Sequence, residues 1–127
     1  MSKVLAAAAL LVVAITGCLA AEKKAKPADL REKIAGRTVI INTSIGDIPV
    51  VYHPNGAISG KLTTMQAMAT GPKVDKGQWW VDGDRLCQKW RNWLRGERHC
   101  FRLQFSGKTI HWASDTGTKG TARLASY

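Results

Sequence analysis

The pattern of apolar and polar positions divides the chain into three parts, and the first is a hydrophobic leader. After Met1, Ser2 and Lys3, positions 4–15 are twelve consecutive apolar residues, mostly Ala, Leu and Val. A bilayer-spanning helix needs about 20 such residues, so the run is short for a membrane span and is typical of a secretory signal peptide. We therefore expect an exported protein.

The sequence that follows the leader allows two cleavage sites. Positions 15–18 read ITGC, which resembles a bacterial lipobox, where the peptide is cut before the cysteine and the thiol is lipidated. The alternative is a small-residue site near Ala20 and Ala21, which would leave a soluble protein. The first interpretation predicts a signal peptide at 1–17 and a lipid anchor on Cys18. Both predict a periplasmic protein, or one anchored in the outer membrane, of a Gram-negative bacterium.

The rest of the chain is expected to form a tether, 18–26, and one domain, 27–127. The tether is small and charged and shows no apolar period. The chain has 127 residues, too few for two separate cores. A short helix is predicted at the start of the domain, from Pro27 to Gly36, because Leu30 and Ile34 share one helical face and a glycine suits the end.

From Arg37 onward, apolar residues alternate with polar ones and turn residues recur at short intervals. This pattern predicts a mainly β fold, an antiparallel meander of about seven strands that forms a small barrel or half-barrel. The first strands are expected at 38–43, 48–52 and 57–62. Residues 63–70, TTMQAMAT, suit either a strand or a turn of helix.

Residues 77–100 hold four of the five tryptophans and two of the three cysteines. With Cys18 set aside, Cys87 and Cys100 are an even number in an oxidising compartment, which predicts one disulfide bond. Placing them opposite each other leaves 92–95 as the connecting loop and puts Gln88 opposite His99 on an otherwise apolar face. A hydrogen bond between these two, or a bulge, would satisfy the buried amide.

Two-residue turns at 82–83 and 106–107 would set the flanking hairpins. They place Trp79 opposite Leu86 and Leu103 opposite Ile110. These registers and the disulfide put one set of residues on the same face. The predicted core is Trp79, Leu86, Trp90, Phe101, Leu103, Phe105, Ile110 and Trp112.

The chain has a formal net charge of +10, and many cations fall on the polar side of the tryptophan region. Trp93 is predicted to be exposed in the loop between them. The predicted face comprises Arg85, Lys89, Arg91, Trp93, Arg95, Arg98 and Arg102, with Glu97 as its one counter-charge. Such a face favours an anionic envelope polymer, a lipid surface or an envelope protein as partner, without specific nucleic-acid binding. The structural alternative is a solvated surface that covers the disulfide.

Residue patterns for catalysis or cofactor binding are not found. There is no Ser-His-Asp arrangement, nucleophile elbow, phosphate loop or Gly-rich dinucleotide turn. The histidines are scattered, and Asp75, Asp82, Asp84 and Asp115 stand in turn contexts that favour aspartate for backbone reasons. We expect no enzyme activity, metal or cofactor.

Several of these residues also carry a family resemblance. The pattern Tyr52-x-Pro-Asn-Gly, Gly77-x-Trp-Trp, Leu86-Cys-x-x-Trp and a second cysteine at 100 followed by Phe resembles a family of short exported proteins from Gram-negative bacteria, known as a domain of unknown function. The similarity covers roughly residues 30–113. It implies an exported, disulfide-bonded, β-rich module and no established activity.

Three noncatalytic functions are compatible with these observations. The leading hypothesis is a cell-envelope module that binds an anionic component or a partner protein through the basic face. A second is a lipocalin-like carrier of an apolar small molecule, which predicts a cavity lined by Trp79, Trp90 and Trp112. A third is an inhibitor of a secreted hydrolase that presents the loop 92–96.

Overall fold

The computed structural model of the protein describes residues 27–125. The predicted signal peptide, the candidate lipidation site Cys18 and the predicted tether lie outside the described residues, as do positions 126 and 127.

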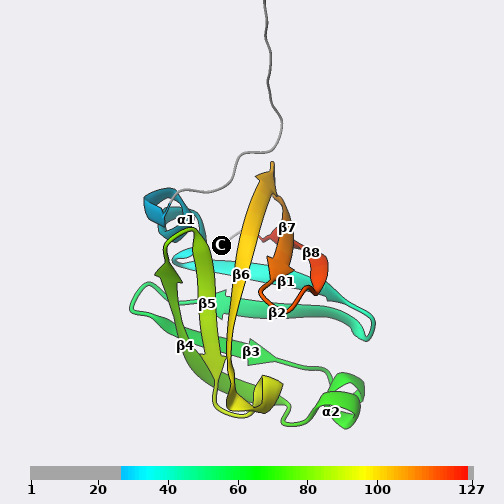
Figure 1. The fold of residues 1–127 in the computed structure, drawn as a ribbon. Coiled ribbons are helices and arrows are strands. Elements are labelled where there is room, and N and C mark those ends of the chain that lie inside the picture. Colours follow the sequence, from blue (N-terminus) through cyan, green and yellow to red (C-terminus); the bar gives the residue numbers. More distant parts are fainter. Residues whose placement is uncertain (1–26, 126–127) are drawn as a thin grey trace, which may run out of the picture.

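The domain is an eight-stranded antiparallel meander closed into a barrel (Figure 1). In chain order its elements are α1 (Pro27–Ile34), β1 (Arg37–Thr43), β2 (Gly46–Tyr52), β3 (Ala57–Lys61), α2 (Thr64–Thr70), β4 (Val74–Asp82), β5 (Arg85–Trp90), the 3-10 segment η2 (Trp93–Gly96), β6 (Arg98–Ser106), β7 (Thr109–Ser114) and β8 (Lys119–Leu124). The predicted mainly β fold is confirmed, with one strand more than the expected seven.

Pairing of the first strand with the last closes the barrel. Val39 of β1 faces Leu124 of β8, and Ile41 faces Ala122. Closure leaves no free sheet edge among residues 27–125, which removes the unpaired backbone groups that an open meander would expose.

Helix α1 covers one end of the barrel. Leu30 and Ile34 are fully buried, as their shared face predicted, and the helix packs against β1 and β4. Gly36 follows it with φ +78°, a left-handed conformation that favours glycine. No helix within residues 27–125 is long and apolar enough to cross a membrane.

The ambiguous segment 63–70 is a helix at the opposite end. Thr63 and Gln66 form a capping box, in which the Thr63 side chain accepts from the Gln66 N–H and the Gln66 side chain accepts from the Thr63 N–H. The Gln66 amide also donates to the carbonyls of Ile45 and Asp47. The capping box stabilises a helix over this segment rather than a strand. Gln66 also connects α2 to the β1–β2 turn.

The disulfide register is as predicted, and the two hairpin registers are shifted. Cys87 is bonded to Cys100 and faces it across β5 and β6. Trp79 faces Gln88 instead of Leu86, and Leu103 faces Trp112 instead of Ile110. Each turn holds its glycine first, at 83 and 107 with φ near +60°, as in a type II′ turn, rather than second as expected.

The shift equals two residues, so every side chain keeps its face. Of the predicted core, Trp79, Leu86, Trp90, Leu103 and Ile110 are buried, and Phe101, Phe105 and Trp112 are partly buried against them. The core prediction is therefore confirmed although two registers were wrong.

Candidate ligand cavity and the basic face

The interior of the barrel is incompletely filled. A cavity of about 350 Å³ runs among the inward-facing side chains. Its wall is mainly aliphatic and aromatic, with contributions from Val39, Ile41, Val50, Leu86, Leu103 and Ile110. Trp90 and Trp112 line it as the carrier hypothesis predicted, whereas Trp79 does not.

Trp79 instead joins the closed end of the barrel. Its indole N–H donates to the His53 carbonyl at 2.8 Å, and its ring meets Tyr52 edge-on at 5.6 Å between centroids. The Arg31 guanidinium of α1 lies 5.0 Å from the Trp79 ring centroid. Ile34 of the same helix lines the cavity, so α1 forms its floor.

The cavity opens at the other end, near α2 and η2. Its lining there includes the exposed residues Thr70, Leu94, Thr116 and Thr118. They come from the end of α2, from η2 and from the β7–β8 turn. Residues that are both exposed and part of the lining mark the mouth of the cavity.

A buried polar pair interrupts the apolar wall. The Tyr52 hydroxyl donates to Oε1 of Gln88 at 2.9 Å, and both residues line the cavity. Burial raises the pKa of Tyr52 far above its ordinary value, so the hydroxyl keeps its proton. Gln88 thus bonds to Tyr52, and the predicted bond between Gln88 and His99 is wrong.

Several polar atoms of the wall have no hydrogen-bond partner within the described part of the chain. Gln88 as a whole is 5 % exposed, and its Nε2 makes no hydrogen bond among residues 27–125. The same holds within this range for Nε2 of His99 and Nε1 of Trp112. A mostly apolar wall with a few hydrogen-bonding groups is the usual chemistry of a small-molecule site.

Trp93 belongs to the core, which corrects its predicted exposure. It is 7 % exposed and lines the cavity beside Trp90, with 4.5 Å between ring centroids. Its indole N–H donates to the Pro72 carbonyl at 2.8 Å. It cannot stack on an external polymer.

The carboxylate of Asp75 holds the segment that carries Trp93. It accepts hydrogen bonds from the backbone N–H groups of Asn92 and Trp93, both at 2.8 Å, and from the Asn92 amide at 3.2 Å. Burial raises the pKa of Asp75, but these bonds and one from the Lys76 backbone outweigh it, and the pKa lies below its ordinary 3.8.

Sequence reasoning missed this arrangement, although glycine in a strand was a signal for it. A Cβ on Gly60 would overlap the indole of Trp93 and lie 3.1 Å from that of Trp90. Glycine inside a strand often marks a close approach of another group. Here the bare backbone of β3 gives the two tryptophan rings their space.

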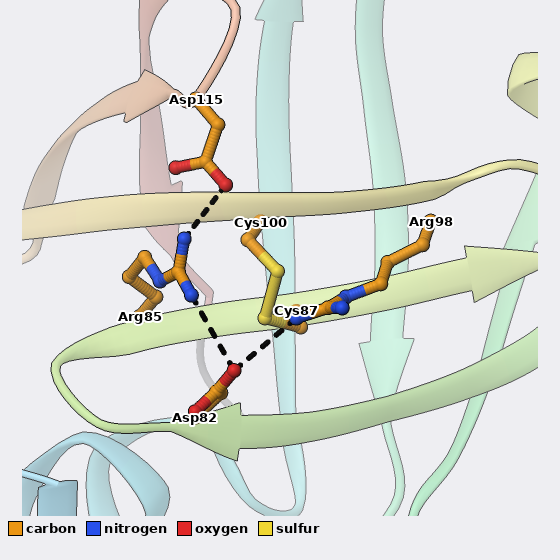
Figure 2. Close-up of a disulfide and its surroundings, with 6 residues drawn as sticks. All are labelled: Asp82, Arg85, Cys87, Arg98, Cys100 and Asp115. Carbon is orange, nitrogen blue, oxygen red and sulfur yellow. Dashed lines mark hydrogen bonds and ion pairs between the residues drawn. A yellow bond between two sulfur atoms is a disulfide. The ribbon is translucent and has the colours of Figure 1, made fainter.

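Half of the cations of the predicted basic face are paired with carboxylates, and Figure 2 shows two of them, Arg85 and Arg98. Arg85 contacts Asp115 at 2.8 Å and Asp82 at 3.4 Å, and Asp82 also meets Arg98 at 3.2 Å. Figure 2 shows these pairs around the disulfide. The expectation of a single counter-charge, Glu97, is wrong because the turn aspartates lie beside the arginines.

The remaining cations of that face are less engaged. Arg102 lies 3.6 Å from Asp84. In the described part of the chain, Lys89, Arg91 and Arg95 have no carboxylate within ion-pair distance. These three lie near the end of β5, in the connection that follows it and in η2, and they keep an uncompensated positive charge.

Within residues 27–125, no group of three or more His, Cys, Asp or Glu side chains could hold a metal ion. Comparisons with protein-family models, curated proteins and solved structures found no match. The resemblance to a family of short exported proteins stays a prediction.

Proposed function

We propose that the barrel is a noncatalytic binding protein for a small apolar molecule that carries one hydrogen-bonding group. The observation that carries this proposal is the apolar cavity of about 350 Å³ with a mouth at the α2 end. A filled core would have left no such space, because protein interiors normally pack as densely as organic crystals.

The size of the cavity limits the ligand. Ligand pockets commonly measure about 300–1,000 Å³, and an apolar cavity of about 150 Å³ accepts benzene. The volume therefore suits a two-ring aromatic or a medium-length acyl chain. The mainly apolar wall favours such a body over a sugar or a nucleotide.

The polar pair supplies the second element of recognition. Within residues 27–125, Nε2 of Gln88 makes no hydrogen bond, so a ligand hydroxyl, carbonyl or carboxyl that reaches it would give this amide donor a partner. We therefore expect decanol and decanoic acid to bind more tightly than decane. The preference should disappear in a Tyr52→Phe/Gln88→Leu variant, which removes both polar groups together.

Titration of intrinsic fluorescence tests the proposal, because Trp90, Trp93 and Trp112 all line the cavity. Decanoic acid should change the emission with a saturable curve. Ala122→Phe places a ring in the cavity and should weaken binding at least tenfold. Ala113→Phe is the matched control, since Ala113 faces away from the interior on neighbouring β7.

Saturable binding that survives in Ala122→Phe would place the ligand elsewhere and reject the proposal. Absence of any saturable change with decanoic acid, decanol and naphthalene would reject it as well.

The basic face remains a second candidate site, for an anionic envelope polymer or a partner protein. The unpaired Lys89, Arg91 and Arg95 favour it, since their charge is not neutralised locally. Binding of purified lipopolysaccharide should weaken steeply with salt and fall in Lys89→Gln/Arg91→Gln. Salt-independent binding would contradict this candidate.

A further inference from the structure

The exposed apolar side chains gather at the mouth of the cavity. The large exposed hydrophobic residues of the described chain are Ile45, Met65, Met68, Val74 and Leu94. They occupy the β1–β2 turn, α2, the start of β4 and η2, which all lie at the end opposite α1 (Figure 1). Met65 and Met68 are 81 % and 83 % exposed. Clustering of this kind marks an interaction surface, whereas scattered exposed residues would not.

This end of the barrel is held together by side-chain hydrogen bonds. The Gln66 amide binds α2 to the Ile45 carbonyl, and the Trp93 indole binds η2 to the Pro72 carbonyl. Asp75 fixes the start of η2 through two backbone N–H groups. These bonds hold the exposed apolar residues in place around the mouth of the cavity. We call this surface, formed by the β1–β2 turn, α2, the start of β4 and η2, the rim.

Two rim residues adopt a backbone conformation that disfavours side chains. Leu94 and Arg95 have φ of +54° and +61°, and they are the described non-glycine residues with positive φ. The left-handed region places Cβ close to the backbone, so it is normally left to glycine. The strained pair presents one apolar and one cationic side chain beside the cavity, and strain of this kind collects at functional sites.

Cations surround the apolar side chains of the rim. Lys61 ends β3, Lys73 precedes β4, Arg91 follows β5 and Arg95 lies in η2. None of these four has a carboxylate within ion-pair distance in the described chain.

The acidic residues of this end do little to neutralise it. Asp47 is paired with Arg123, and Asp115 is paired with Arg85. Asp75 is buried and bound to backbone. Among residues 27–125, Glu97 is the exposed carboxylate at this end that has no ion pair. The rim is therefore net positive.

We propose that this rim docks on the surface of an anionic lipid bilayer, so that the cavity opens toward the acyl chains that supply its ligand. Protruding Met, Leu and Ile side chains flanked by Lys and Arg match the chemistry of the lipid interface. The cations face anionic headgroups while the apolar residues enter the acyl boundary. This inference rests on the proposed function, because docking would serve to load the cavity with its ligand. The docking surface itself is argued from the exposed rim residues and not from the cavity wall.

The test uses the full chain with an environment-sensitive probe at one position. In a Cys18→Ser background the disulfide leaves no free thiol, so Met68→Cys can be labelled with a nitrobenzoxadiazole dye. Vesicles of phosphatidylcholine with 30 mol % phosphatidylglycerol should shift its emission to the blue. The same dye at Lys108→Cys, in the turn beside α1, should not respond. This pair separates rim docking from attachment through residues 1–26, which would leave both dyes in water.

Two variants test the chemistry of the rim. Met65→Ser/Met68→Ser should lower vesicle partitioning at least tenfold without loss of fold, since both side chains are exposed. Lys73→Gln/Arg95→Gln should lower it severalfold on anionic vesicles and should have little effect on pure phosphatidylcholine. Lys33→Gln/Lys108→Gln removes the same charge at the opposite end and should bind as the wild type does.

A dye at position 68 that stays in water, or equal responses at 68 and 108, would overturn the proposal. So would a dimer in solution that dissociates in Met65→Ser/Met68→Ser, because the rim would then belong to a second copy of the chain. Decanoic acid titration without vesicles is independent of docking. Loss of docking with retained fatty-acid binding would therefore reject the rim proposal alone.

Discussion

The carboxylate of Asp75 offers the sharpest test of how the wall of the cavity is built. It is 4 % exposed and accepts three hydrogen bonds from the segment that carries Trp93. We predict that Asp75→Ala lowers the free energy of unfolding by about 3 kcal/mol. A buried donor left without an acceptor costs about 1–3 kcal/mol, and the Trp93 N–H is fully buried whereas that of Asn92 is only partly so.

The isosteric Asp75→Asn change should cost less, about 1–2 kcal/mol. Its amide oxygen can still accept from the backbone, and its NH₂ can meet the Asn92 side chain once that amide turns over. What disappears is the charge, which roughly doubles the strength of each bond.

The effect of Asp75→Asn should also depend on pH. Because the pKa of Asp75 is lowered in the folded protein, its contribution to stability is complete above the ordinary value of 3.8. It is lost as the pH falls through the folded pKa. The difference between wild type and Asp75→Asn should therefore be constant from about pH 5 to pH 7 and shrink in more acidic solution.

Urea denaturation followed by tryptophan fluorescence measures both effects, at pH 7 and at pH 2.5. Asp47→Ala is the matched control, because Asp47 is half-exposed and its ion pair with Arg123 is at the surface. Such pairs contribute about 0–1 kcal/mol. An Asp75→Ala loss no larger than that of Asp47→Ala, or an Asp75→Asn loss that is unchanged at pH 2.5, would refute this account of the loop.

Three further substitutions test other parts of the fold. Cys87→Ala/Cys100→Ala should lower the free energy of unfolding by about 3 kcal/mol, since the bond closes a short loop; a loss under 1 kcal/mol in urea would contradict the chain-entropy estimate. Tyr52→Phe should cost about 1 kcal/mol by freeing the amide of Gln88, and an unchanged thermal midpoint would show that the pair is energetically neutral. Gly60→Ala should cost about 1–3 kcal/mol because its Cβ overlaps a tryptophan ring, and it should alter tryptophan emission; wild-type stability and emission would disprove the close approach.

Much of the fold could be predicted because its determinants are local. Alternation of apolar and polar residues specifies which side of a strand is buried, so Leu86, Trp90 and Leu103 were assigned correctly. This held even where the turn position was wrong, since a two-residue shift leaves each side chain on its face. The disulfide followed from cysteine number and parity.

The candidate site could be predicted only in part. Trp90 and Trp112 were expected in a cavity and line one, but Trp79 was also expected there and belongs to the closed end. The basic face was predicted without its aspartates. Asp115 is 30 residues from Arg85 in sequence and meets it only once β5 and β7 are folded, and Asp82, three residues from Arg85, was interpreted as a turn residue alone.

By itself, the sequence determined the alternation of faces, the cysteine pair and the helix that begins the domain, since each depends on residues close along the chain. Tertiary structure alone decided closure of the barrel, the burial of Trp93 and the presence of a cavity. Closure needs β1, the first strand, to pair with β8, the last. Trp93 is held in the core by its close approach to Gly60 and its hydrogen bond to Asp75, and neither residue is its neighbour in sequence. The cavity arises because eight strands enclose a volume that their inward side chains do not fill, a balance that exists only when all strands are in place.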